Sequence, residues 1–138
     1  MKKRVRICAV LLIAVLLLNG AAAIAETSGK FGQLSWKLDN RGTLTVSGRG
    51  RMDSYNEPWD KLRSSIKRVI IKDGVLNIGS NNFADCINLE SVTMADSVVS
   101  IDSFAFNRCN KLKEVVFGKG LISIGQYAFT DCTQLVSV

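Results

Sequence analysis

The chain has 138 residues, a formal net charge of +6 and no histidine. The missing histidine excludes the Ser-His and Cys-His pairs of nucleophilic enzymes and the commonest general base. Four of the 18 basic residues lie in the first six positions, which leaves 14 basic residues, mixed with the 12 acidic ones, in the rest of the chain. We therefore predict no nucleic-acid partner, because phosphate binding needs a clustered basic surface.

Residues 1–25 have the pattern of a secretory signal peptide. Lys2, Lys3, Arg4 and Arg6 precede an unbroken apolar run at residues 7–18, and Ala-Ile-Ala at residues 23–25 is a small-x-small cleavage pattern. A retained membrane anchor is the alternative, but the run is shorter than the roughly 20 residues that a spanning helix needs. We predict a secreted or cell-surface protein with no membrane insertion after signal cleavage.

Residues 26–63 do not follow the repeat that comes later in the chain, and they predict an N-terminal β-hairpin cap. Residues 34–38 and 43–47 alternate apolar and polar side chains, and residues 39–42 have turn composition. Pro58 suits the first position of a short helix running to about Arg63. A stack of repeats must cover the apolar end of its first coil, which is the role we expect for this segment.

Three aromatic residues in this segment, Trp36, Tyr55 and Trp59, have two interpretations. They are either a sugar-binding platform or the seal between the cap and the first coil. We favour the seal, because aromatic side chains dominate apolar burial in small cores.

The rest of the chain repeats with a period of 23 residues. IGSNNFADCINLESVTMADSVVS is followed by IDSFAFNRCNKLKEVVFGKGLIS and then by IGQYAFTDCTQLVSV. Apolar residues that recur at one fixed period predict the stacked coils of a solenoid. The clearest recurring columns are Ile78, Ile101 and Ile124; Phe83, Phe106 and Phe129; Cys86, Cys109 and Cys132; and Leu89, Leu112 and Leu135.

Each repeat predicts one strand and one return path. The segment L-x-x-V-x-F/M alternates inward and outward side chains at residues 66–71, 89–94, 112–117 and from 135 onward. Short turns of helix are expected near residues 103–106 and 126–129. The fold class is therefore α/β: a right-handed solenoid with one curved parallel sheet and helical turns on its convex side. One period upstream, Arg63 takes the cysteine column and Asp60 the phenylalanine column.

Cys86, Cys109 and Cys132 lie one period apart, and we favour three buried free thiols that fill the core. Equivalent positions on neighbouring coils point the same way, which holds the sulfur atoms apart. A disulfide and a zinc site remain as alternatives, although the close ligand spacing typical of zinc sites is missing. We predict no metal and no cofactor.

The repeat resembles the BspA-like bacterial leucine-rich repeat, whose signature is I-G-x-x-A-F-x-x-C-x-x-L-x-x-V-x-F. The match is clearest in IGQYAFTDCTQLVSV, and the upstream LSWKLDNRGTLTVSGRGRMDSYNEPWDKLRSSIKRVIIKDGVLNIG is similar to the segment that opens many such proteins. Asp102 departs from the usual glycine, and Asn82 departs from the usual alanine. Asn82 must bond a backbone group or lie at the surface, because an unpaired buried amide is costly.

The resemblance implies exported or surface-displayed proteins that bind host extracellular proteins or other cells. We predict a module that binds a protein ligand, such as an extracellular-matrix or cell-surface protein, through the outward strand positions. A plain solvated face is the alternative, because these columns lack the aromatic and arginine enrichment of binding hot spots. The candidate residues are Arg68, Ser91 and Glu114 in one column and Ile70, Thr93 and Val116 in the next.

An enzyme is not expected. Paired carboxylates are conceivable among Asp85, Asp102, Glu114 and Asp131, but Asp85 and Asp131 occupy equivalent turn positions where acids are ordinary surface residues. Gly48-Arg49-Gly50 is too short for a phosphate loop. The sequence contains no convergent acid-base set.

The domain organisation expected from these patterns is a signal peptide at 1–25, the cap at 26–63 and leucine-rich repeats at 64–138. The last repeat stops inside a strand without a polar capping element. An uncapped coil exposes apolar core and a strand edge. We therefore expect self-association through that end, or a chain that is a truncated fragment of a longer surface adhesin.

Overall fold

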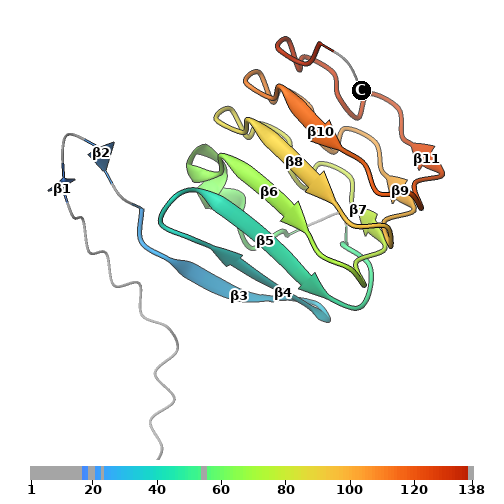
Figure 1. Cartoon of the computed structure of the whole chain (residues 1–138), viewed down its shortest axis with the longest axis horizontal. Coiled ribbons are helices and arrows are strands. Elements are labelled where there is room, and N and C mark those ends of the chain that lie inside the picture. The colour runs from blue at the N-terminus through green and yellow to red at the C-terminus, as the bar shows by residue number, and fades with distance from the viewer. Residues whose placement is uncertain (1–16, 19–20, 23, 54–55, 137–138) are drawn as a thin grey trace, which may run out of the picture.

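The computed structural model describes residues 17–18, 21–22, 24–53 and 56–136 (Figure 1). Most of the expected signal segment at 1–25 therefore lies outside the described residues, as does Tyr55. Two short strands, β1 (Leu17–Leu18) and β2 (Ala21–Ala22), pair antiparallel at its end. In the described ranges, no helix has the length and apolar character to cross a membrane.

Six strands form the main sheet, in the spatial order β10-β8-β6-β5-β4-β3 (Figure 1). Strands β3, β4 and β5 pair antiparallel with one another. Strand β5 then begins a parallel series that continues through β6, β8 and β10. The strands are β3 (Thr27–Phe31), β4 (Leu34–Leu38), β5 (Thr43–Gly48), β6 (Arg68–Ile71), β8 (Ser91–Met94) and β10 (Glu114–Val116).

The predicted hairpin is confirmed as β4 and β5. Its turn is closed by Asp39, whose Oδ1 accepts hydrogen bonds from the backbone N–H groups of Arg41 (2.8 Å) and Thr43 (2.9 Å). Strand β3 was not predicted, because its sequence Thr-Ser-Gly-Lys-Phe is mostly polar and does not alternate. The hairpin and the repeats share one continuous sheet, and the role of residues 26–63 as a cap stays a prediction.

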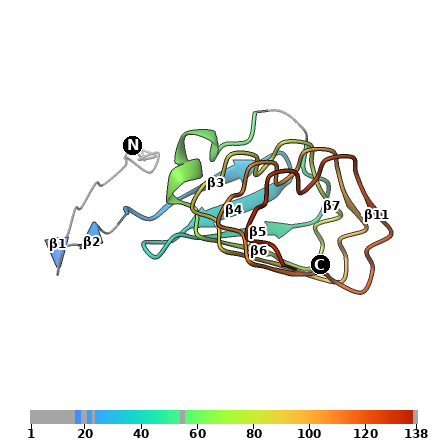
Figure 2. The ribbon, with the colours of Figure 1, turned by 90° about the horizontal axis from the view of Figure 1, so that it is seen from above.

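A second parallel sheet corrects the prediction of a single sheet. It contains β7 (Asn77–Ile78), β9 (Ser100–Ile101) and β11 (Ser123–Ile124), one short strand from each coil. Figure 2 looks along the stack and shows the coils as superposed outlines, with the main sheet along one side and the second sheet at another. The fold is a mostly-sheet solenoid that resembles leucine-rich repeat proteins.

The prediction of helical turns near residues 103–106 and 126–129 is wrong. These segments are non-helical turns, because Phe104 (φ 58°) and Tyr127 (φ 59°) adopt left-handed backbone angles that interrupt a right-handed helix. In the part of the chain that the structure describes, the only helix is the 3₁₀ helix η1 (Asp60–Ser65). It replaces the short helix expected to end near Arg63, and the α/β class is not supported.

A column of stacked aromatic rings runs through the coils. Successive rings lie 5.3–5.5 Å apart with interplanar angles of 6–10°. Trp59 leads the column, which corrects the placement of Asp60 there. Trp59 and Trp36 are buried and their rings meet edge to face, so for these two residues the packing interpretation is confirmed. The column consists of Trp59, Phe83, Phe106 and Phe129.

The first coil is longer than the others, which explains the misplaced column. Thr45 of β5 pairs with Ile70 of β6, and the Met52 N–H donates to the Asn77 Oδ1, both across 25 residues. From β6 onward, Ile70 pairs with Thr93 at the regular period of 23. Counting back by 23 residues therefore holds for β6 but fails for Trp59 and for β5.

Asn82 is fully buried and bonds backbone groups on both sides, as expected from its position in the sequence. Its Oδ1 accepts from the Gly79 N–H (3.0 Å), and its Nδ2 donates to the Asp53 carbonyl (2.9 Å). Asp102, the other departure from the repeat, accepts from Asn77 Nδ2 (3.0 Å) and Ser100 Oγ (3.2 Å). Both departures tie neighbouring coils together.

Cys86, Cys109 and Cys132 are buried free thiols, as favoured from their spacing. The Cys109 Sγ donates to the Phe83 carbonyl and the Cys132 Sγ to the Phe106 carbonyl, both at 3.1 Å. Burial raises the pKa of the Cys86 thiol from 9.0 to about 12. Each thiol fills the space between adjacent coils and satisfies a carbonyl where one is available.

We expect Cys86 and Cys109 to resist modification in the folded protein. At about pH 8, Ellman's reagent should leave both unlabelled until guanidinium is added, because burial raises the pKa of the Cys86 thiol and the neighbouring Cys132 thiol, together with burial, raises that of Cys109, so that little thiolate forms. Because the folded-state pKa of Cys86 is raised, the neutral thiol contributes stability below 9.0, and that stability is lost as pH rises toward about 12. Site-resolved mass spectrometry gives the readout, and rapid native labelling of Cys86 would contradict this expectation.

Candidate binding face

The six candidate binding residues lie side by side on the outer face of the main sheet. Parallel pairing places Arg68 beside Ser91 and Ser91 beside Glu114. The same register aligns Ile70, Thr93 and Val116. The intervening residues of β6 and β8 point into the core, so the predicted columns are correct in geometry.

Exposure on this face increases toward β10. Arg68, Ile70 and Ser91 are half-buried, whereas the last three candidates, Thr93, Glu114 and Val116, are exposed. Val116 is 45% exposed, which is high for a large apolar side chain in a strand. A partner that covers β8 and β10 would therefore bury new apolar and polar surface together.

Arg68 is held in place by the strand next to it. Its Nε donates to the Thr43 Oγ1 and its Nη2 donates to the Arg41 carbonyl, both at 3.1 Å. A guanidinium that is already oriented loses less side-chain entropy when a ligand binds. Arg68 therefore presents a fixed positive charge beside the column of Ile70, Thr93 and Val116.

The face extends further than the sequence indicated. Thr45 continues the row of Ile70 onto β5, and Lys37 continues it onto β4. Lys37 points outward because Trp36 and Leu38 point inward, and Thr45 points outward because Leu44 and Val46 point inward. Their alignment with the repeats does not follow from the 23-residue period, because Thr45 pairs with Ile70 across 25 residues.

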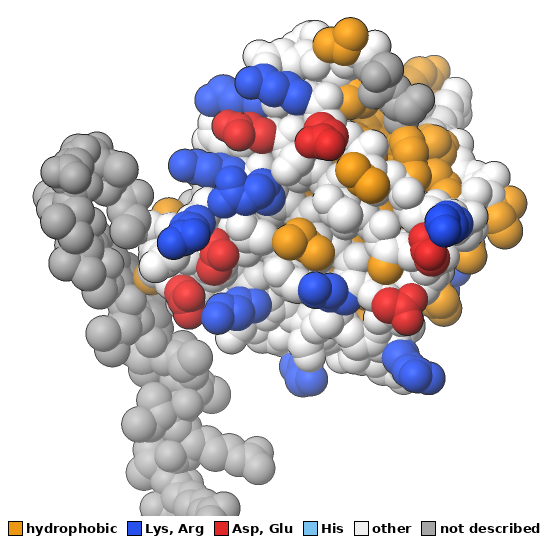
Figure 3. Space-filling view, viewed as in Figure 1, with side chains coloured by type: hydrophobic (Ala, Val, Ile, Leu, Met, Phe, Trp, Pro, Cys, Tyr) orange, Lys and Arg blue, Asp and Glu red, His pale blue; other side chains and the backbone are white. Residues whose placement is uncertain are grey.

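Charged side chains of both signs gather where the parallel strands of the main sheet begin (Figure 3). Hydrophobic side chains gather on the opposite side, toward β11. The two candidate columns contain no aromatic residue, so the face lacks the usual anchors of a protein-binding hot spot. The mixture of charges argues against a polyanionic ligand.

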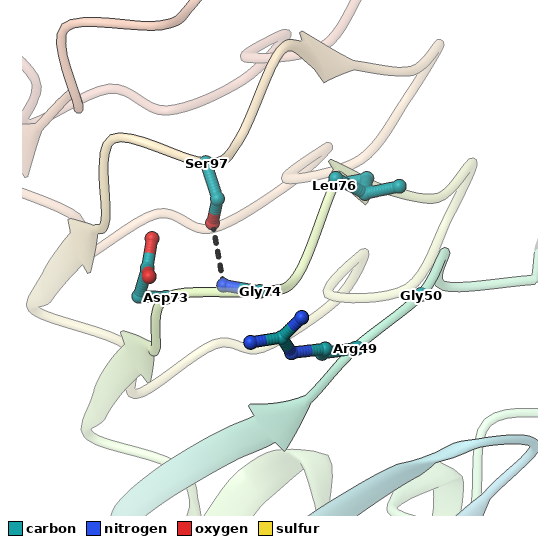
Figure 4. Close-up of a pocket in the computed structure, with 6 residues that line it drawn as sticks. All are labelled: Arg49, Gly50, Asp73, Gly74, Leu76 and Ser97. Atoms are coloured by element: carbon teal, nitrogen blue, oxygen red, sulfur yellow. Dashed lines mark hydrogen bonds between the residues drawn. The ribbon is translucent and has the colours of Figure 1, made fainter.

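A hollow of about 400 Å³ lies beside this face, where the chain passes from the main sheet to the second sheet (Figure 4). Arg49 follows β5, Asp73 follows β6 and Ser97 follows β8, so three successive coils contribute to it. The lining residues are Arg49, Gly50, Asp73, Gly74, Leu76 and Ser97.

Within the residues that the structure describes, no group of three or more His, Cys, Asp or Glu is arranged to hold a metal ion. Asp85 and Asp131, considered above as a carboxylate pair, each occupy the same left-handed turn position, at φ 57° and 59°. Arg108 stands between them in sequence register and forms an ion pair of 3.6 Å with Asp85. These carboxylates belong to the surface of the turns.

Comparison with known proteins agrees with the repeat and the fold. The family model described as BspA type Leucine rich repeat region (6 copies) matches residues 61–138. A search of curated proteins finds no significant match. A crystal structure of a leucine-rich repeat protein from Eubacterium ventriosum is 30% identical with a TM-score of 0.70, and the alignment covers 77% of this chain and 30% of that one.

Two further crystal structures are similar in fold alone. A leucine rich cell surface protein from Faecalibacterium prausnitzii is 22% identical with a TM-score of 0.54, over 79% of this chain and 35% of that one. A leucine rich repeat protein from T. pallidum is 23% identical with a TM-score of 0.51, over 79% of this chain and 48% of that one. The chain thus spans less than half the length of each of these structures. The match of the family model over residues 61–138 shows that the chain belongs to the BspA-type leucine-rich repeat family.

Proposed function

We propose that the chain is an exported binding module that recognises a protein ligand through the outer face of β6, β8 and β10. The observation that carries this proposal is the pair of side-chain columns held in register across the three strands. A regular parallel sheet fixes the spacing of outward side chains, and solenoids use such surfaces for recognition.

Family membership supports protein binding as the general role, and the signal pattern at residues 1–25 supports export. One structure of similar fold is described as a cell surface protein. We propose that the ligand is an extracellular-matrix protein or a protein of another cell. A chain that is one piece of a longer surface adhesin would use the same face.

The test is binding of the chain to immobilised fibronectin, fibrinogen and a panel of other matrix proteins. We expect saturable binding to one of them, and we expect the double variant Thr93→Arg/Val116→Glu to weaken it by at least about tenfold, because both side chains are exposed on the proposed contact face.

Ile122→Glu is the matched control. Ile122 is 84% exposed and lies just before β11, away from the face, so its replacement should leave affinity unchanged. Equal losses in the two variants would contradict the face assignment. No saturable binding across the panel would contradict adhesion to matrix proteins.

A further inference from the structure

The hollow beside the binding face has a frame of hydrogen bonds that links three coils. The Gly50 N–H donates to the Gly74 carbonyl (3.1 Å), and the Leu76 N–H donates to the Gly50 carbonyl (2.9 Å). Ser97 completes the frame, because its Oγ accepts from the Gly74 N–H (3.0 Å) and donates to the Val75 carbonyl (2.8 Å). A ligand would meet a backbone that is already ordered.

Gly74 keeps the floor of the hollow free of side chains. Its φ of 102° is a left-handed angle, and a Cβ there would lie 2.4 Å from the Gly48 carbonyl oxygen. No other residue fits this position without moving the backbone. The floor therefore consists of main chain.

Two opposite charges and one apolar side chain border the hollow. Figure 4 shows the Arg49 guanidinium and the Asp73 carboxylate on either side of the Gly74 backbone, with Leu76 at the far end. Both charged residues are exposed, and neither takes part in an ion pair in the described part of the chain. Leu76 is 40% exposed.

We propose that this hollow binds a zwitterionic ligand with an apolar side chain, which is either a free α-amino acid or the same pattern of charges on a peptide. The ligand carboxylate would pair with Arg49, whose guanidinium suits bidentate contact, and its cationic group would pair with Asp73. The apolar part would lie against Leu76. The volume of about 400 Å³ falls within the usual range for small-ligand sites.

Opposite charges on the site give a clear selectivity. A ligand that carries only a carboxylate gains the contact with Arg49 but is repelled by Asp73. A ligand that carries only a cation gains the contact with Asp73 but is repelled by Arg49. Both site charges are exposed, so each ion pair is weak and binding in the millimolar range is expected. This site goes beyond the proposed recognition of a protein through the sheet face.

The test is NMR titration of the ¹⁵N-labelled full chain with leucine, N-acetylleucine and leucinamide. We expect the Gly50 and Gly74 amide signals to shift saturably with leucine. N-acetylleucine and leucinamide, which each lack one charge of leucine, should bind about threefold to fivefold more weakly. A blocked peptide, acetyl-Lys-Leu-Glu-amide, forms the second arm. Tighter binding of leucine identifies a free amino acid as the ligand, and tighter binding of the peptide identifies a peptide segment.

Arg49→Gln and Asp73→Asn should each weaken the binding of leucine about threefold to fivefold. Glu90→Gln and Lys113→Gln remove the same kinds of charge from exposed positions away from the hollow, and they should leave the titration unchanged. Equal shifts with all three small ligands, or titrations of both hollow variants that match the unmodified chain, would overturn the proposal. So would the absence of any shift with leucine and the peptide.

Discussion

Replacing Trp59 by alanine is expected to lower the free energy of unfolding by about 3–5 kcal/mol, because a large, fully buried aromatic side chain would leave a cavity. Trp59 is 0% exposed and stacks on Phe83 with ring centroids 5.5 Å apart. The rings of Phe31 and Trp36 meet its ring edge to face at 5.3 Å and 6.1 Å. Trp59 therefore joins the antiparallel strands to the first coil of the solenoid.

Urea denaturation followed by circular dichroism gives the comparison, with Trp59→Phe and Phe129→Ala as matched variants. Trp59→Phe keeps a ring in the column but loses the bond from Nε1 to the Asn82 carbonyl (2.9 Å), so a smaller loss of about 1–2 kcal/mol is expected. Phe129 stands at the other end of the column and is only half-buried. A cost for Trp59→Ala no larger than that for Phe129→Ala would contradict the central role of Trp59.

The repeat predicted the strands of the main sheet well because its columns alternate. Val92 and Met94 point inward while Ser91 and Thr93 point outward, so the period of two along β8 is visible in the letters. The same alternation predicted which side chains of β8 and β10 point outward. Binding itself does not follow from this pattern, because a solvated sheet face has the same alternation.

The second sheet could not be predicted in this way. Its strands have two residues each, such as Ser100–Ile101, which is too short for alternation to appear. The turns that follow resemble helical turns in sequence because Phe106 and Phe129 recur at core positions. Phe104 is the deciding residue: its left-handed φ of 58° is rare for an aromatic side chain, and no local pattern signals it.

The hollow was not predicted from the sequence, because its members come from three coils. In the sequence, Arg49 is flanked by two glycines that are too close together for a phosphate loop, and no pattern connects it with Asp73 or Ser97. The two additional residues of the first coil place Gly50 beside Val75, a register that the 23-residue period does not give. Side chains brought together by an irregular coil leave no periodic signal.

Arg63 is the second residue whose loss should be severe, because it occupies the position in its coil where later coils have cysteine. Its Nη1 donates to the carbonyls of Asn81 (3.3 Å), Asn82 (3.2 Å) and Ala84, whereas each later cysteine donates to a single carbonyl or none. Its Nη2 also pairs with the carboxylate of Glu57, whose side chain is 8% exposed. The guanidinium thus serves one nearly buried carboxylate and several backbone carbonyls at once.

Arg63→Met is expected to cost about 3–5 kcal/mol, since it leaves a buried carboxylate without its cation. The double variant Arg63→Met/Glu57→Gln removes that charge as well and should regain part of the loss, which a double-mutant cycle in urea measures as coupling. Asp60→Asn serves as the control, because the ion pair of Asp60 with Arg63 (2.9 Å) is exposed on the Asp60 side and should contribute at most about 1 kcal/mol. Additive effects of the Arg63 and Glu57 changes would mean that Arg63 stabilises the fold through its bonds to the carbonyls rather than through the buried ion pair.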